Sequence, residues 1–166
     1  MKVINPKKSL GQNFLTDKNI INIIVDQGNI GKKDIVLEVG PGTGSLTEKI
    51  LSKNPKKIFA IEKDKYLSKD LSKKFKEKLI IINEDILKFD EKKLSNQPMI
   101  VFGNLPYNIS TQIFIKWVRL INLNKTFKKL ILMFQKEVAE RILATTNQKN
   151  YGRLAVLSSW RMNVKK

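Results

Sequence analysis

The stretch DIVLEVGPGTGS, residues 34–45, joins an apolar run to a glycine-rich turn. The run DIVLEVG is typical of a strand that is buried on both faces of a sheet. Glycines at positions 40, 42 and 44 then allow a tight turn and a close approach of the backbone to a ligand. A helix is predicted from 44 to 52. This succession of strand, turn and helix is typical of the first unit of a doubly wound α/β sheet.

The rest of the chain repeats the alternation of strand and helix. Apolar runs predict further strands at 56–62, 78–83, 99–104 and 128–134. Helices are predicted at 18–27, 66–75, 110–121, 136–145 and 153–160, with Asp17 and Ser110 as candidate N-caps. Such alternation indicates βαβ units and a mostly parallel sheet with helices on both faces. We therefore predict one doubly wound α/β domain over residues 1–166, of which residues 1–17 form a basic N-terminal arm.

The composition narrows the possible chemistry. The sequence contains no Cys and no His, which excludes thiol nucleophiles, imidazole bases, disulfides and the usual zinc ligands, so no metal site is expected. A formal net charge of +17 favours a polyanionic partner, most simply nucleic acid, although a Lys-, Asn- and Ile-rich composition also fits an AT-rich genome. With no apolar signal core and no run of membrane-spanning length, we expect a cytoplasmic protein without a membrane partner.

The strand ends carry the candidate binding residues, because ligands of such sheets lie at the carboxyl ends of the strands. Ser45 stands where a dinucleotide fingerprint has its third glycine, and Pro41 has no N–H for a phosphate, so the turn suits a ligand without phosphates better than NAD. Glu62 ends the second strand where nucleotide folds bind ribose hydroxyls. Asp85 follows the third strand and could accept a hydrogen bond from an adenine amine. Together these residues predict a nucleoside pocket.

The fourth strand ends in Asn104-Leu105-Pro106-Tyr107, and here the chain resembles a known family. It is similar to the ribosomal RNA adenine dimethyltransferases, which use S-adenosylmethionine. The segments that carry the resemblance are KSLGQNFL (8–15), VLEVGPGTG (36–44), Glu62, EDIL (84–87), NLPYNIS (104–110), QKEVAER (135–141) and YGRL (151–154). They extend over nearly the whole chain, in the order that the family shows.

The resemblance implies roles for the fourth-strand residues. The Asn104 side-chain oxygen and a backbone carbonyl, that of Leu105, would accept the two protons of the adenine N6 amine and so free its lone pair for attack on a sulfonium methyl. Pro106 would hold Leu105 extended, and Tyr107 would stack on the base. This implies dimethylation of adenines in small-subunit (16S) ribosomal RNA during ribosome biogenesis.

The resemblance also assigns the cofactor site and the partner. S-adenosylmethionine would be bound by Gln12, Asn13, Leu15, Gly40, Gly42, Glu62, Lys63, Asp85, Ile86 and Asn104. Phe14 and Leu15 would pack beneath the cofactor, while lysines of the arm would contact phosphates of small-subunit RNA or a pre-30S particle. We expect a monomer.

Two questions remain open at the level of the sequence. Members of the family continue with two more strands, a proline-rich segment and a helical domain, so we expect the last strands and the C-terminal helical domain to be absent here. A macrolide-resistance-type methylase of 23S RNA shares the strand-four motif, and a non-catalytic nucleic-acid-binding relative is a second alternative. The latter would be expected to lose pocket residues, whereas Glu62, Asp85 and Asn104 are all present. A nicotinamide oxidoreductase is disfavoured by the glycine spacing.

Overall fold

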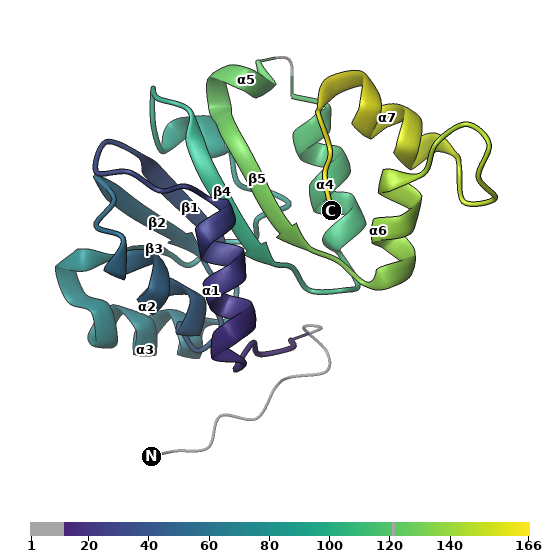
Figure 1. Ribbon diagram of the computed structural model, residues 1–166. Helices are drawn as coiled ribbons and strands as arrows, with labels where there is room; N and C mark the ends of the chain where they lie inside the picture. The colour runs from purple at the N-terminus through teal and green to yellow at the C-terminus, as the bar shows by residue number, and fades with distance from the viewer. Residues whose placement is uncertain (1–11, 121) are drawn as a thin grey trace.

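The computed structural model describes residues 12–120 and 122–166, and its centre is a five-stranded parallel sheet (Figure 1). The strands are β1 (Ile35–Val39), β2 (Lys57–Ile61), β3 (Ile80–Ile82), β4 (Met99–Asn104) and β5 (Phe127–Met133). Their order is β3-β2-β1-β4-β5. The chain therefore reverses its direction of winding between β1 and β4. All five predicted strands and the doubly wound parallel sheet are confirmed.

Helices cover both faces of this sheet. They are α1 (Lys18–Gln27), α2 (Ser45–Ser52), α3 (Lys65–Phe75), α4 (Ser110–Val118), α5 (Leu123–Thr126), α6 (Lys136–Leu143) and α7 (Arg153–Arg161). Asp17 caps α1 as predicted, because its carboxylate accepts hydrogen bonds from the amides of Asn19 and Ile20. The described residues also form short 3-10 turns at Lys76–Lys78 and Glu91–Lys93.

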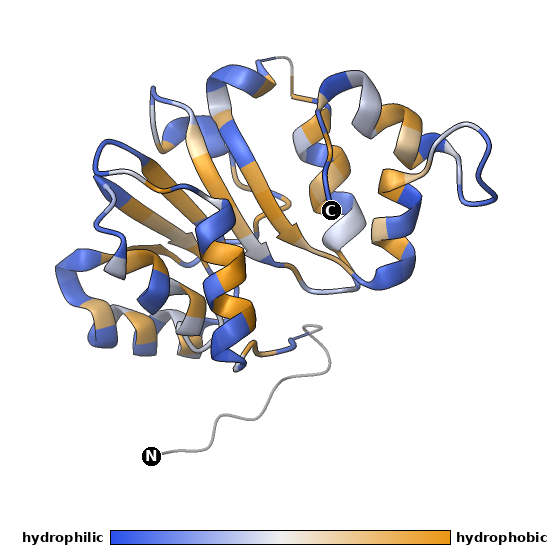
Figure 2. Ribbon diagram, viewed as in Figure 1, coloured by the Kyte–Doolittle hydropathy of each residue, from blue (hydrophilic) through white to orange (hydrophobic). Residues whose placement is uncertain are grey.

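The apolar core consists of three clusters. Alternate strand residues such as Val36, Ile58 and Phe102 pack against α1, α2 and α3 on one face. The opposite residues, such as Leu37 and Val101, pack against α4. In Figure 2 the orange of hydrophobic residues is concentrated on the strands and on one side of α1. A third cluster joins α4 to α6 and α7 through Phe114 and Ile142.

The strand register brings the ends of three strands to the same level. Val39 of β1 pairs with Ile61 of β2 on one side and with Gly103 of β4 on the other. The next residue along each strand is therefore Gly40, Glu62 or Asn104. Parallel pairing thus places at one edge of the sheet three residues that the sequence separates widely.

Two local predictions, both about the helix after the strand-four motif, were wrong. Ser110 does not cap α4: the N-cap is Ile109, while Ser110 is a buried first residue of the helix whose hydroxyl donates to the Tyr107 carbonyl over 3.3 Å. The same helix ends at Val118 rather than near 121. The short α5, directly before β5, was not predicted. Helix α1 buries Ile21 and Val25 and exposes Ile20 and Ile23.

Some predictions fall partly outside the described residues. Of the basic arm at 1–17, only residues 12–17 are described. No helix within 12–120 and 122–166 is long and apolar enough to cross a membrane. The same residues contain no cluster of three or more carboxylates that could hold a metal ion.

Candidate functional site at the carboxyl ends of the strands

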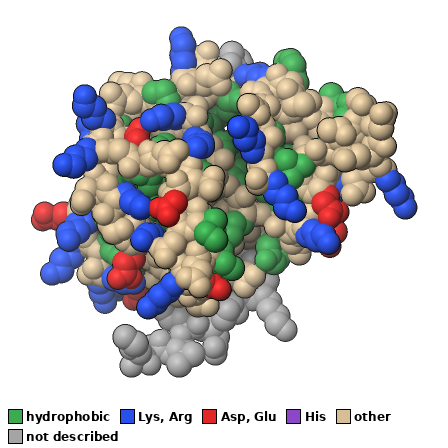
Figure 3. All heavy atoms as spheres, viewed as in Figure 1, with side chains coloured by type: hydrophobic (Ala, Val, Ile, Leu, Met, Phe, Trp, Pro, Cys, Tyr) green, Lys and Arg blue, Asp and Glu red, His purple; other side chains and the backbone are tan. Residues whose placement is uncertain are grey.

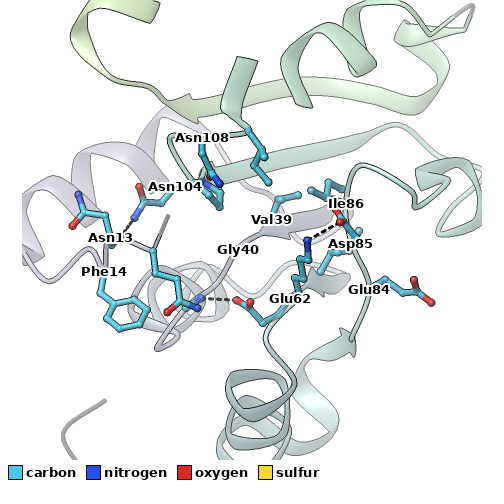
Figure 4. A pocket seen from close by; sticks show the side chains of 16 residues that line it. Asn13, Phe14, Val39, Gly40, Glu62, Glu84, Asp85, Ile86, Asn104 and Asn108 are labelled. Atoms are coloured by element: carbon cyan, nitrogen blue, oxygen red, sulfur yellow. Dashed lines mark hydrogen bonds and ion pairs between the residues drawn. The ribbon is translucent and has the colours of Figure 1, made fainter. Parts of the chain in front are cut away.

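A pocket opens at the carboxyl edge of the sheet, beside the switch point between β1 and β4. It encloses about 780 Å³ of empty space, part of which is open to solvent. Its lining comes from the segment before α1, the ends of β1, β2 and β4, and the loops after β3 and β4: Gln12, Asn13, Phe14, Val39, Gly40, Gly42, Ile61, Glu62, Lys63, Glu84, Asp85, Ile86, Asn104, Pro106, Asn108 and Ile109 (Figure 4). Such a position, outside the carboxyl ends of the strands and beside the switch point, is where open α/β sheets bind their ligands.

The glycine turn forms one wall because its backbone is left-handed at three positions. Gly40, Gly42 and Gly44 have φ of 68°, 58° and 84°. A side chain would be strained at each of them. A Cβ at Gly42 would lie 2.9 Å from Phe14 Cδ1, and one at Gly44 would lie 2.7 Å from Leu71 Cδ2. The turn therefore needs glycine both for its conformation and for the close approach of Phe14 and α3.

Glu62 is a buried carboxylate held by backbone amides. Its Oε1 accepts from the Asp64 amide at 2.9 Å and its Oε2 accepts from the Gly42 amide at 3.3 Å, so it links the end of β2 to the glycine turn. Burial raises the pKa of Glu62, whereas these two amide bonds act to lower it. A carboxylate accepts up to about four hydrogen bonds. Glu62 therefore retains the capacity to accept hydroxyl donors from a ligand in the pocket.

Asp85 and Lys63 form an ion pair at the other end of the pocket. Lys63 Nζ lies 2.9 Å from Asp85 Oδ2, and the Leu87 amide donates to Asp85 Oδ1 at 3.0 Å (Figure 4). The hydrogen bond from Lys63 is the main cause that lowers the pKa of Asp85. The group is therefore an ionised acceptor rather than a donor. It lies beside Ile86, whose side chain packs into the core.

Asn13 connects the N-terminal segment to both polar residues of the strand-four motif. Its backbone carbonyl accepts from Asn104 Nδ2 at 2.6 Å, and its own Nδ2 donates to the Tyr107 hydroxyl at 2.9 Å. The first bond turns the nitrogen end of the Asn104 amide toward Asn13, so the oxygen end faces elsewhere. Asn13 thus sets the orientation of both Asn104 and Tyr107. The sequence predicted Asn13 as a cofactor contact only.

The residues between Asn104 and Tyr107 anchor the motif. The Leu105 side chain is 1% exposed and packs into the same core cluster as Ile113 of α4. The carbonyl of Pro106 accepts from the amides of Ile109 and Ser110 at 3.1 and 2.9 Å, which leads the chain directly into α4. Tyr107 remains 42% exposed. The motif is therefore fixed by Leu105 and Pro106, whereas Tyr107 is accessible to solvent.

A second buried carboxylate, Glu38, lies under the glycine turn. Its Oε2 accepts from the Thr47 hydroxyl of α2 at 2.6 Å, and its side chain is 1% exposed. Burial raises the pKa of Glu38 to about 7, with the nearby Glu62 charge acting in the same direction. Glu38 lines a smaller hollow that adjoins the main pocket and that also includes Leu15. No role of Glu38 was predicted from the sequence.

The structure brings together nearly all residues that were predicted for the site. Gln12, Asn13, Gly40, Gly42, Glu62, Lys63, Asp85, Ile86 and Asn104 line the main pocket, and Leu15 lines the adjoining hollow. Of the four predicted catalytic residues, Asn104 and Pro106 line the pocket. Leu105 is buried in the core, and Tyr107 does not line the pocket but is hydrogen-bonded to Asn13, which does. The prediction missed the apolar walls Val39, Ile61 and Ile109, together with Glu84 and Asn108. Val39 and Ile61 could have been found as the last strand residues before Gly40 and Glu62.

Comparison with known proteins agrees with this geometry. The profile of the family "Ribosomal RNA adenine dimethylase" matches residues 3–166. The chain is 54% identical over 163 residues to a ribosomal RNA small subunit methyltransferase A of Pelagibacter ubique, covering 98% of this chain and 62% of that protein. A protein of the same name from Wolbachia pipientis of Culex pipiens is 48% identical, with 99% and 62% covered. The chain thus spans less than two thirds of the length of these curated relatives.

Solved structures are similar as well. A dimethyladenosine transferase from Plasmodium falciparum superposes with a TM-score of 0.76 at 32% identity, covering 87% of this chain and 51% of that one. The 23S rRNA methyltransferase ErmE superposes with a TM-score of 0.68 at 26% identity, covering 78% and 50%. With a family match over almost its full length, a shared fold and the strand-end motifs in one pocket, the chain belongs to the ribosomal RNA adenine dimethylase family.

Proposed function

We propose that this chain is the cofactor-binding and catalytic part of an enzyme that dimethylates adenines of small-subunit ribosomal RNA. The methyl groups would come from S-adenosylmethionine and the product would be N6,N6-dimethyladenosine. The observation that carries the proposal is the convergence of the glycine turn, Glu62, Asp85 and Asn104 on one pocket. Family membership and the names of the relatives support the same reaction.

The residues that line the pocket suit the chemistry of the cofactor. Glu62 would accept hydrogen bonds from the ribose hydroxyls, and Asp85 would accept one from the amine of the adenine ring. Ile61 and Ile86, which also line the pocket, would give the ring apolar contacts. The proposed cofactor contacts are those predicted from the sequence: Gln12, Asn13, Leu15, Gly40, Gly42, Glu62, Lys63, Asp85, Ile86 and Asn104. When bound, S-adenosylmethionine supplies an electrophilic methyl group.

Asn104 and Leu105 would prepare the target amine. The N6 amine of adenine is a weak nucleophile because its lone pair is delocalised into the ring. The Asn104 oxygen would accept a hydrogen bond from one N–H of the amine, and the Leu105 carbonyl would accept one from the other N–H. The nitrogen then moves toward tetrahedral geometry and its lone pair becomes available. The bond from Asn104 Nδ2 to the Asn13 carbonyl supports this role, because it fixes which end of the amide is the acceptor.

The exposed ring of Tyr107 would stack on the target base. A base must leave its helix or loop to reach the pocket, and stacking on an aromatic side chain offsets part of that cost. Lys and Arg side chains are spread over the face of the molecule shown in Figure 3, with few acidic ones among them. Such a surface favours contact with phosphates of small-subunit RNA or of a pre-30S particle. We propose that the protein acts there as a cytoplasmic monomer, without a metal.

Two experiments test this function. Calorimetry of this chain with S-adenosylmethionine and with NAD should give binding for the first only; binding of NAD alone would overturn the assignment. Incubation of a full-length version with undermethylated 16S and 23S RNA, followed by mass spectrometry of the nucleosides, should place dimethyladenosine in 16S RNA.

The RNA experiment also tests the alternative that the enzyme modifies 23S RNA. The similarity to ErmE makes a 23S methyltransferase the alternative function. Dimethyladenosine in 23S RNA alone would favour that alternative and exclude the small-subunit assignment.

A further inference from the structure

Lys116 is the structural centre of the loop that follows β3. It lies on α4, and its side chain is 24% exposed. Its ammonium donates to three oxygens of this loop: the Ile86 carbonyl at 2.6 Å, the Phe89 carbonyl at 2.5 Å and Glu91 Oε1 at 2.7 Å. A lysine ammonium has three donors and no acceptor. These three oxygens therefore use the full donor capacity of Lys116.

The bond to the Ile86 carbonyl acts on Asp85 through one peptide unit. The carbonyl of Ile86 and the amide of Leu87 belong to the same planar peptide group. Lys116 holds the carbonyl end of that plane, and the amide end donates to Asp85 Oδ1 at 3.0 Å. A rotation of the plane would break both bonds together. The position of Lys116 thus determines the direction in which the Asp85 carboxylate is held.

The other end of the loop is held independently. Asn83 Nδ2 donates to the carbonyls of Glu62 and Lys63 at the end of β2. The pocket residues of the loop therefore lie between an anchor on β2 and an anchor on α4. Helix α4 in turn begins directly after the strand-four motif, at the Pro106 carbonyl. Lys116 consequently links Asp85, at one end of the pocket, to helix α4, which continues the strand-four motif at the other end.

We infer that Lys116 is a positioning residue for recognition of the cofactor's adenine ring: by fixing the Ile86–Leu87 peptide it aims Asp85 at the ring's amine. This inference rests on the proposed function. The geometry explains why a lysine occupies this position. Three acceptors point at one nitrogen atom, an arrangement that the planar fork of an arginine does not match. A role in stability alone would not distinguish adenine from other bases.

The test compares two ligands that differ at the recognised atom. S-adenosylhomocysteine has an amine on its purine, whereas S-inosylhomocysteine has an oxygen there, which would face the Asp85 carboxylate. Calorimetry on the unaltered chain should show a preference for the first ligand of roughly tenfold or more, the size of one hydrogen bond to a charged group. In Lys116→Met this preference should fall toward one. Hydrogen exchange of the Leu87 amide, measured by NMR without ligand, should become faster in the same variant.

Two further variants separate positioning from folding. Lys116→Met leaves Glu91 buried without its cation, which can prevent folding. The double variant Lys116→Met/Glu91→Gln removes that charge, and the same loss of preference is expected. Trp117→Phe is the matched control: it deletes the other bond to Glu91, from Trp117 Nε1 at 2.5 Å, and leaves the bond from Lys116 to Ile86 intact. It should keep the preference.

Each outcome bears on one claim. Equal weakening of both ligands, or an undiminished preference in the two Lys116 variants, would overturn the inference while leaving the proposed function in place. An unaltered chain that binds the two ligands equally would remove Asp85 from adenine recognition, and the inference with it. Failure of the unaltered chain to bind either ligand would contradict the proposed function itself.

Discussion

The buried carboxyl of Glu38 should make the stability of this domain depend on pH in a way that one substitution removes. Burial raises the pKa of Glu38 from 4.5 to about 7 in the folded chain. At a pH between these two pKa values, Glu38 keeps its proton in the folded state and has released it in the unfolded state. Because the folded state binds more protons in this window, the free energy of unfolding falls as the pH rises through it, and the loss is complete above about pH 7.

The size of the effect follows from the shift. Integrating the proton-binding difference from about pH 5 to about pH 8 gives a loss of roughly 2–3 kcal/mol for the parent chain. Glu38→Gln cannot titrate, and its amide oxygen can still accept the Thr47 hydroxyl that Glu38 accepts at 2.6 Å. The free energy of unfolding of the variant minus that of the parent should therefore be larger near pH 8 than near pH 5 by about that amount.

Urea denaturation of both proteins at the two pH values measures this difference directly. Titrating groups that do not interact with Glu38 are common to the pair and cancel in the comparison, whereas the coupling between Glu38 and Glu62 is part of the measured difference. Glu48→Gln, the same substitution at an exposed position of α2, is the matched control and should change the pH dependence by less than about 0.5 kcal/mol. If Glu38→Gln and the parent lose stability in parallel between the two pH values, the carboxyl is not held neutral by burial and the reasoning is refuted.

Three other outcomes are expected. Glu62→Ala should weaken S-adenosylmethionine binding in calorimetry by about 1–3 kcal/mol, because ribose hydroxyls lose a charged acceptor; unchanged affinity would remove Glu62 from the site. Gly44→Ala should lower the free energy of unfolding by about 2–4 kcal/mol, because its left-handed backbone and the nearby Leu71 oppose a Cβ. Gly152→Ala, where a Cβ would meet nothing within 4 Å, is its control and should cost about 0.5 kcal/mol or less, so equal losses would contradict this account. Affinity for small-subunit RNA should fall steeply as salt rises, since phosphate contacts release counterions, whereas a flat response in filter binding would mean that the charge reflects composition alone.

The centre of the sheet could be predicted because β1 and β4 are buried on both faces. Residues 35–39 and 99–103 are apolar except for Glu38, and the glycine turn marks where the first strand ends. The pocket edge followed from this, since parallel strands bring Gly40, Glu62 and Asn104 to one level. These features depend on local sequence and on the pairing rules of parallel sheets.

The remaining features depend on contacts between distant segments. Ser110 resembles an N-cap in sequence, but the Pro106 carbonyl takes up its amide and its side chain is buried. The hydrogen bond between Asn13 and Tyr107 joins residues that are 94 positions apart, and no local sequence pattern predicts it. Nothing in the sequence distinguishes Lys116 from the other lysines of this basic chain. Only the fold places its ammonium against the loop after β3.

Methyl transfer by Asn104→Ala tests the central claim most directly. A full-length version of the protein would be mixed in excess with undermethylated small-subunit RNA and labelled S-adenosylmethionine, and incorporated methyl groups would be counted over a single turnover. Because Asn104 is proposed to engage the amine mainly as it becomes tetrahedral, the rate should fall by roughly 10²-fold or more while RNA affinity is largely kept. Transfer at the parental rate would contradict the proposed chemistry at this pocket.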